Sequence, residues 1–183
     1  MTEQPFLPWD SVWIEVRDGD ATAAAIYDRH YSRNPGSRGD SRVAGPGEKM
    51  VLLTPCCRAL FVWRKFISKD PTAGREDVNC AIFRNEGAGL SSALILEAME
   101  LAWRRWPGRR LYTYVNPRRV RSANPGFCFV SAGWRRCGTT KTRRLLILEA
   151  MAVSAATRPL PQLPVHRTPP APPPHPSAGP RPA

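Results

Sequence analysis

The chain has 183 residues and a mass of 20.4 kDa, enough for one ordinary domain with a hydrophobic core and too little for two. It has 27 lysines and arginines against 15 acidic residues, a formal net charge of +12, and all but four of the cations are arginines. This excess of fixed cations favours a polyanionic partner, either nucleic acid or a phosphate-bearing cofactor. No apolar run of about 18 residues and no signal-peptide layout occur, which predicts a cytoplasmic protein without membrane contact.

The prolines separate a tail from the fold. Eleven of the 20 prolines lie between Pro159 and Pro182, where no apolar periodicity survives. We therefore expect a folded domain over residues 1–157 and a disordered proline-rich tail over residues 158–183. Because the tail holds three arginines and no acid, the folded part keeps a net charge of +9.

The first half of the chain predicts a strand, a helix and an antiparallel sheet. Residues 11–17 alternate apolar and polar side chains, and residues 21–31 place apolar side chains three and four apart, as in a short helix. Residues 33–47 combine glycines, prolines and arginines and predict a long basic loop. Three strands are expected next, at residues 50–54, 59–67 and 78–83.

The second half predicts a crossover helix and a final hairpin. Residues 90–106 carry the clearest helical stripe, which ends at Pro107-Gly108. A strand at residues 111–115, a short helix from about Pro125 to Gly133, and a hairpin of residues 135–142 and 143–149 follow. This order of elements predicts an α/β (α+β) fold, a mixed sheet with antiparallel front strands and flanking helices.

The five cysteines do not predict a disulfide or a metal site. They are odd in number and include no pair spaced CxxC. Cys80 and Cys128 are expected as small buried hydrophobic residues. No metal ligand set is predicted.

A glycine-rich turn joins the strand at residues 78–83 to the long helix. Its sequence is Arg84-Asn85-Glu86-Gly87-Ala88-Gly89. Such a turn directs backbone N–H groups and the positive end of the helix dipole at a phosphate. The spacing fits neither a P-loop nor the dinucleotide fingerprint, and a tight turn with glycines for steric reasons is the alternative.

In its context this turn resembles the pyrophosphate-binding motif of the GNAT (acyl-CoA N-acyltransferase) superfamily. The matching residues are Arg84, Gly87 and Gly89, followed by a helix, a strand ending at Val115-Asn116, a short helix and Ala132-Gly133-Trp134. The resemblance covers residues 11–149 and implies a GNAT-like sheet with two central splayed strands. It also implies acetyl-CoA or a related acyl-CoA as cofactor, held by Ile82, Phe83, Arg84, Asn85, Glu86, Gly87, Ala88, Gly89 and Leu90.

A narrower resemblance concerns His30-Tyr31-Ser32 and residues 115–134, which look like the phage-encoded Mom-type DNA-modification proteins. It implies a transferase that adds a small acyl-like or acetamido-like group to a DNA base, adenine first, in the host cytoplasm, protecting phage DNA from restriction. The implied partner is double-stranded DNA with the target base flipped into a pocket. The catalytic candidates are His30, Tyr31, Ser32, Asn116 and Asn124.

These candidates have simpler interpretations as well. His30 can titrate near neutral pH and Tyr31 can stack on a base or donate a proton. Alternatively, Tyr31 belongs to the core, His30 is a solvated helix end, and Asn124 starts a helix before Pro125.

Two features depart from ordinary acetyltransferases. Phe129 stands where the family has a tyrosine that protonates the leaving thiolate, so another group must act as acid or the reaction differs from simple acetyl transfer. The segment between Asn116 and Gly133 is also longer and rich in arginine. The nucleic-acid candidates are Arg33, Arg38, Arg42, Arg118, Arg119 and Arg121.

Two other functions remain open at this point. One is a conventional acetyl-CoA-dependent N-acetyltransferase acting on a small amine or protein. The other is an inactive GNAT-like fold that only binds nucleic acid or a protein partner.

Overall fold

The computed structural model describes residues 11–66 and 77–152. The expected tail at residues 158–183 lies outside these ranges. The elements follow one another in this order: β1 (Ile14–Val16), α1 (Ala21–Asp28), the short 3-10 helix η1 (Pro35–Ser37), β2 (Glu48–Leu53), β3 (Ala59–Lys65), β4 (Val78–Asn85), α2 (Ser91–Arg105), β5 (Leu111–Val115), α3 (Phe127–Ser131), β6 (Arg135–Thr139) and β7 (Leu146–Ala150).

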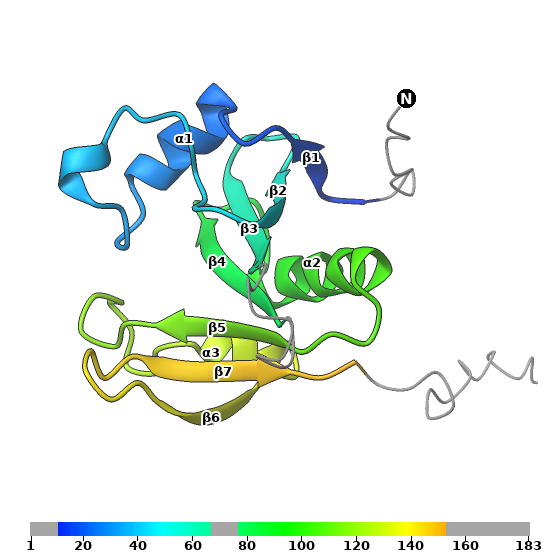
Figure 1. The fold of residues 1–183 in the computed structure, drawn as a ribbon, viewed down its shortest axis with the longest axis vertical. Coiled ribbons are helices and arrows are strands. Elements are labelled where there is room, and N and C mark those ends of the chain that lie inside the picture. Colours follow the sequence, from blue (N-terminus) through cyan, green and yellow to red (C-terminus); the bar gives the residue numbers. More distant parts are fainter. Residues whose placement is uncertain (1–10, 67–76, 153–183) are drawn as a thin grey trace, which may run out of the picture. The chain divides into compact units, whose positions relative to one another are not determined.

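The described strands form one mixed, open sheet of seven strands in the order β1-β2-β3-β4-β5-β7-β6 (Figure 1). Only β4 and β5 are parallel, with α2 as their connection, and every other neighbouring pair is antiparallel. The α/β class expected from the sequence is therefore confirmed. None of the described helices combines the length and the apolar character needed to span a bilayer.

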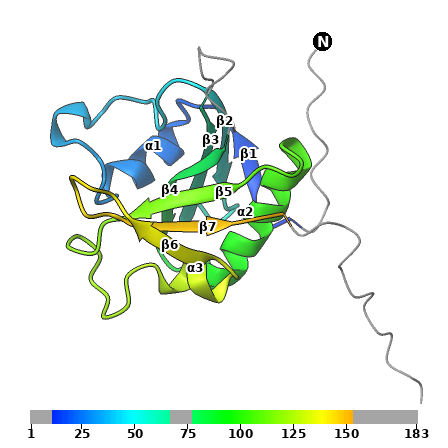
Figure 2. The same ribbon diagram turned by 60° about the horizontal axis from the view of Figure 1, so that its bottom comes forward.

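Helices cover both faces of the sheet, because the central strands are apolar on both sides (Figure 2). On β3, Phe61 and Trp63 pack with α2 and α3, while Leu60 and Val62 pack with α1 on the opposite face. The Trp63 indole also donates a 2.9 Å hydrogen bond to the Ala98 carbonyl of α2. Burial on both faces fixes the register of the strands, since a slip by one residue would move the side chains of each face to the opposite face.

The parallel pair separates after a short contact. Residue pairing between β4 and β5 runs from Val78↔Leu111 to Cys80↔Thr113, although β4 continues to Asn85. Beyond Cys80, β4 stays with β3 and β5 stays with β7, so the two strands diverge (Figure 1). This divergence is the splay that the resemblance led us to expect.

Several element boundaries differ from those expected. β4 extends to Asn85 because its ladder with β3 continues through Leu60↔Arg84 and Ala59↔Asn85, so Arg84 belongs to a strand rather than to a turn. α1 ends at Asp28, where the Arg29 N–H caps the helix, and His30 and Tyr31 lie in the turn beyond it.

Candidate functional site

A pocket of about 390 Å³ lies where β4 and β5 diverge. β4 contributes Ala81 and β5 contributes Tyr114, and the other walls come from the turn after α1 and from the loops at the ends of β5 and β7. Its lining residues are His30, Tyr31, Ser32, Arg33, Asn34, Pro35, Ala81, Tyr114, Asn116, Arg119, Arg143 and Leu145. Four of the five predicted catalytic residues therefore meet in one place, from segments far apart in sequence.

The exception is Asn124, which is exposed and does not line this pocket. Its side-chain oxygen accepts a hydrogen bond from Arg136, and its carbonyl accepts one from the Phe127 N–H at 3.1 Å. The alternative interpretation of Asn124 as the residue that starts the helix is wrong, because the N-cap of α3 is Gly126 and no side chain forms a cap hydrogen bond there.

His30 is buried, with 8% of its surface exposed, so it is not a solvated helix end. The Ser32 backbone N–H donates to its Nδ1 at 3.2 Å, and the Ser32 Oγ lies 2.7 Å from the same nitrogen. Because Nδ1 accepts from a backbone N–H, it carries no proton, and the Ser32 hydroxyl must be the donor to it. The His30 proton is then on Nε2.

The environment of His30 keeps the ring neutral. Burial, and to a lesser degree the positive charge of Arg84, lowers the pKa of His30 from 6.5 to about 4, against the opposing effect of a hydrogen bond to the Phe83 backbone. The expectation that His30 titrates near neutral pH is therefore wrong, because water cannot solvate the imidazolium at this position.

The lowered pKa predicts a loss of stability in acid. The unfolded chain binds a proton at His30 below pH 6.5 and the folded protein only below about pH 4. Stability attributable to His30 is thus present above pH 6.5 and is lost as the pH falls toward 4, by roughly 3 kcal/mol in total. Urea unfolding of the native protein and of His30→Asn from pH 7 to 4 measures this difference. Equal pH dependence in the two proteins contradicts the prediction.

Tyr31 forms the wall next to His30. The two rings are 4.3 Å apart between centroids and tilted by 32°, and Tyr31 is partly buried. Burial raises the pKa of the Tyr31 phenol, as do the Cys80 and Cys128 thiols, while a hydrogen bond from the Asn116 backbone favours the phenolate. The hydroxyl is therefore protonated at neutral pH and lies close to the end of β5.

Phe129 belongs to the core. It is buried with 5% exposure and packs edge-on against Phe83 at 5.9 Å and Trp134 at 5.0 Å between centroids. No hydroxyl reaches the diverging strands from this position, which leaves Tyr31 and Tyr114 as the phenols of the pocket.

The glycine-rich turn is ordered by Asn85. Its side-chain oxygen accepts from the N–H groups of Gly87 and Ala88, and its amide donates to the Gly89 carbonyl and the Ser91 hydroxyl at 2.8–2.9 Å. These bonds hold the start of α2 against the end of β4.

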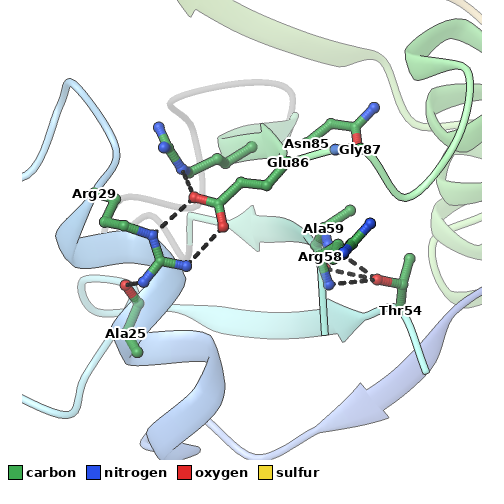
Figure 3. A network of polar contacts seen from close by, with 9 residues as sticks. Ala25, Arg29, Thr54, Arg58, Ala59, Asn85, Glu86 and Gly87 are labelled. Atoms are coloured by element: carbon green, nitrogen blue, oxygen red, sulfur yellow. Dashed lines mark hydrogen bonds and ion pairs between the residues drawn. The ribbon is translucent and has the colours of Figure 1, made fainter. Parts of the chain in front are cut away.

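Two arginines enclose the Glu86 carboxylate beside this turn (Figure 3). Arg29 binds both carboxylate oxygens at 2.8 and 2.7 Å, and the Arg84 Nε lies 2.6 Å from one of them. Hydrogen bonds from these arginines, that from Arg29 above all, lower the pKa of Glu86 to about 2 against the weaker effect of desolvation. Arg29 was not predicted from the sequence, because only the fold brings it to a residue 57 positions away.

The turn has features that fit a phosphate. Gly87 and Gly89 have φ values of +93° and +151° in open space, a backbone that favours glycine and leaves room for a ligand. Leu90 starts α2 without a side-chain cap, so the N–H groups of the first helical turn have no partner within the helix. Because Gly87 and Ala88 already donate to Asn85, an anion at this turn would have to bind the N–H groups between Gly89 and the first turn of α2.

The predicted nucleic-acid residues fall into two groups. Arg38, Arg42, Arg118, Arg119 and Arg121 are exposed, as expected for surface contacts. Arg33 is different: it is 7% exposed, pairs with Asp28 at 2.8 Å and donates to the Asp40 and Arg42 carbonyls. Arg33 therefore orders the basic loop from inside, although it also lines the pocket.

A second cationic loop lies beside the predicted one. Pairing of Val115 with Leu146 places the loop after β5 next to the turn before β7, which carries Lys141, Arg143 and Arg144. The sequence signal for this face is a stretch without acids, since residues 101–148 contain twelve cations and no aspartate or glutamate. Arg119 and Arg143, one from each loop, line the pocket itself.

The described lining of the pocket contains no carboxylate. In the part of the chain that the structure describes, no group of three or more histidine, cysteine, aspartate or glutamate residues could hold a metal ion. No protein-family model, curated protein or solved structure matches this chain.

Proposed function

We propose that the protein is a GNAT-type transferase that attaches a small acyl-like or acetamido-like group to a DNA base, adenine in first place. The observation that carries this proposal is the pocket at the diverging strands, whose lining, in the described part of the chain, contains His30, Tyr31, Ser32 and arginines but no acid.

The divergence of β4 and β5 and the glycine-rich turn support the proposal that the protein is an acyl-CoA-dependent transferase. The turn at Gly87 and Gly89 and the uncapped start of α2 fit the pyrophosphate of acetyl-CoA or a related acyl-CoA. When bound, such a cofactor supplies an activated acyl group. Arg84 and Arg29 add positive charge beside the turn, although both are paired with Glu86.

The positive charge of the pocket supports a nucleobase, and not an alkylamine, as the substrate that accepts the acyl group. An aliphatic amine is an ammonium ion at neutral pH and must lose a proton before it attacks, a task for a carboxylate or another base. Arg119 and Arg143 repel such a cation, and the described lining offers no carboxylate to receive it. An exocyclic amino group of a nucleobase is neutral already, so it loses a proton only as the new N–C bond forms and not before it attacks. The phosphodiester backbone of DNA is attracted by the same arginines. These points disfavour the conventional acetyltransferase of alkylamines.

Within the pocket the chain supplies hydrogen bonds and a proton source. Tyr31 presents a phenol that is protonated at neutral pH, and Asn116 offers an amide edge able to read a base. Neutral His30 holds the Ser32 hydroxyl in one orientation.

The test is mass spectrometry of nucleosides from plasmid DNA recovered from cells that express the full chain. We expect a new nucleoside with the native protein and none with Gly87→Glu, which places a carboxylate in the phosphate turn. Gly108→Glu is the matched control, because Gly108 also has a positive φ and open space but lies beyond the other end of α2. An unchanged nucleoside profile, together with acetyl-CoA turnover on amines without DNA, would replace this proposal by the conventional acetyltransferase.

A further inference from the structure

Both polar hydrogen atoms of Ser32 are donated to the same acceptor. Its backbone N–H and its hydroxyl both point to Nδ1 of His30, at 3.2 and 2.7 Å. A hydroxyl has one hydrogen and two lone pairs, so the Ser32 Oγ has only lone pairs left to offer. Ser32 is exposed and lines the pocket.

His30 cannot reverse this arrangement near neutral pH. Its ring is buried, in contact with the tilted Tyr31 ring, and bonded to the Phe83 backbone, which fixes its orientation. The Ser32 hydroxyl would become a donor to the pocket only if Nδ1 acquired a proton. The backbone N–H of Ser32 would then point at the N–H of the protonated Nδ1, which is unfavourable because both groups are donors.

We propose that Ser32 selects the acceptor substrate by taking a hydrogen bond from its N–H, and that His30 is the positioning residue that keeps the Ser32 hydroxyl in this role. This inference rests on the proposed function and adds the substrate group that is read. An exocyclic amino group donates an N–H, whereas a keto group or a bare ring carbon at the same position offers none. A site built to bond an N–H rejects a ligand that lacks it.

The experiment measures, by fluorescence anisotropy, the affinity of the full-length chain for two oligonucleotides. One carries a single adenine in a run of thymines, and the other carries unsubstituted purine, which lacks only the amino group, at the same place. We expect the native protein to bind the adenine oligonucleotide about tenfold more tightly, the size of one good hydrogen bond. Ser32→Ala should bind both equally, with unchanged affinity for the purine oligonucleotide.

Conservative variants separate selection from a structural role. Ser32→Thr keeps the hydroxyl and should keep the preference. His30→Asn retains a short hydrogen-bond acceptor at the position of Nδ1, and it should keep part of the preference for the adenine oligonucleotide. His30→Phe has no such acceptor, and it should abolish the preference while both oligonucleotides still bind.

The possible failures are distinguishable. Equal binding of both oligonucleotides by the native protein, or a preference that survives in Ser32→Ala, overturns this inference and leaves the proposed function standing. Absence of binding to either oligonucleotide overturns this inference, and the nucleoside analysis of plasmid DNA then decides separately on the proposed function.

Discussion

Replacing Arg119 and Arg143 together by alanine should weaken binding of duplex DNA by one to two orders of magnitude at moderate salt. It should also reduce the salt dependence of binding. Each cation that neutralises a phosphate contributes about 0.9 to the slope of log K against log salt, so the double variant should lower that slope by about 1.8. Both side chains are exposed, line the pocket and come from different loops.

The matched control removes the same charge elsewhere. Arg17 and Arg104 are also exposed, and neither lines the pocket. Arg17→Ala with Arg104→Ala therefore lowers the net charge equally, and we expect it to change the slope little. Titrations of labelled duplex DNA at several salt concentrations measure both effects. Equal losses of DNA affinity in the two double variants would mean that DNA is attracted by the net charge alone. The two loops would then form no specific DNA-binding surface.

The fold brings the loops that carry Arg119 and Arg143 side by side. Val115 and Leu146 are neighbours in the β5–β7 ladder, so the segments that extend beyond them stay adjacent at one end of the sheet. Cations on either loop alone would be ordinary surface charge. Brought together without an intervening acid, they create a local positive potential that raises both affinity and association rate.

The sheet could be predicted from the sequence because its signals are local. Alternating or continuous apolar runs marked β2, β3 and β4, and the helical stripe of α2 with Pro107-Gly108 after it located the crossover. The boundaries were less accurate where a neighbour decides them. β4 reaches Asn85 because β3 offers it partners, which no propensity at Arg84 or Asn85 indicates.

The site was only partly predictable, since it depends on distant contacts and on side-chain orientation. His30, Tyr31, Ser32 and Asn116 were all singled out, and they share one pocket. The roles of the arginines were not predictable, because Arg29 and Arg33 owe them to Glu86 and Asp28, whose positions the fold determines. The Ser32–His30 bond spans only two residues but requires a particular rotamer and tautomer, which composition does not reveal.

Tyr31→Phe should abolish most of the proposed transferase activity, with a fall in kcat of about two to four orders of magnitude. Phe129 cannot supply a proton, whereas burial raises the pKa of the Tyr31 phenol, which is therefore protonated at neutral pH and available as an acid. The ring of phenylalanine keeps the tilted contact with His30, so the fold and the DNA affinity should be retained.

Tyr114→Phe is the matched control, because Tyr114 lines the same pocket and is 44% exposed. Single-turnover formation of the modified nucleoside, measured for both variants across pH, tests the assignment. For the native protein we expect any alkaline decline due to Tyr31 above pH 10, since burial moves its pKa upward from that value. A large loss in Tyr114→Phe with little change in Tyr31→Phe would transfer the role of acid to Tyr114. Loss of DNA binding in Tyr31→Phe would instead mean that the Tyr31 hydroxyl contributes to binding the DNA, and the fall in kcat could then not be assigned to proton donation.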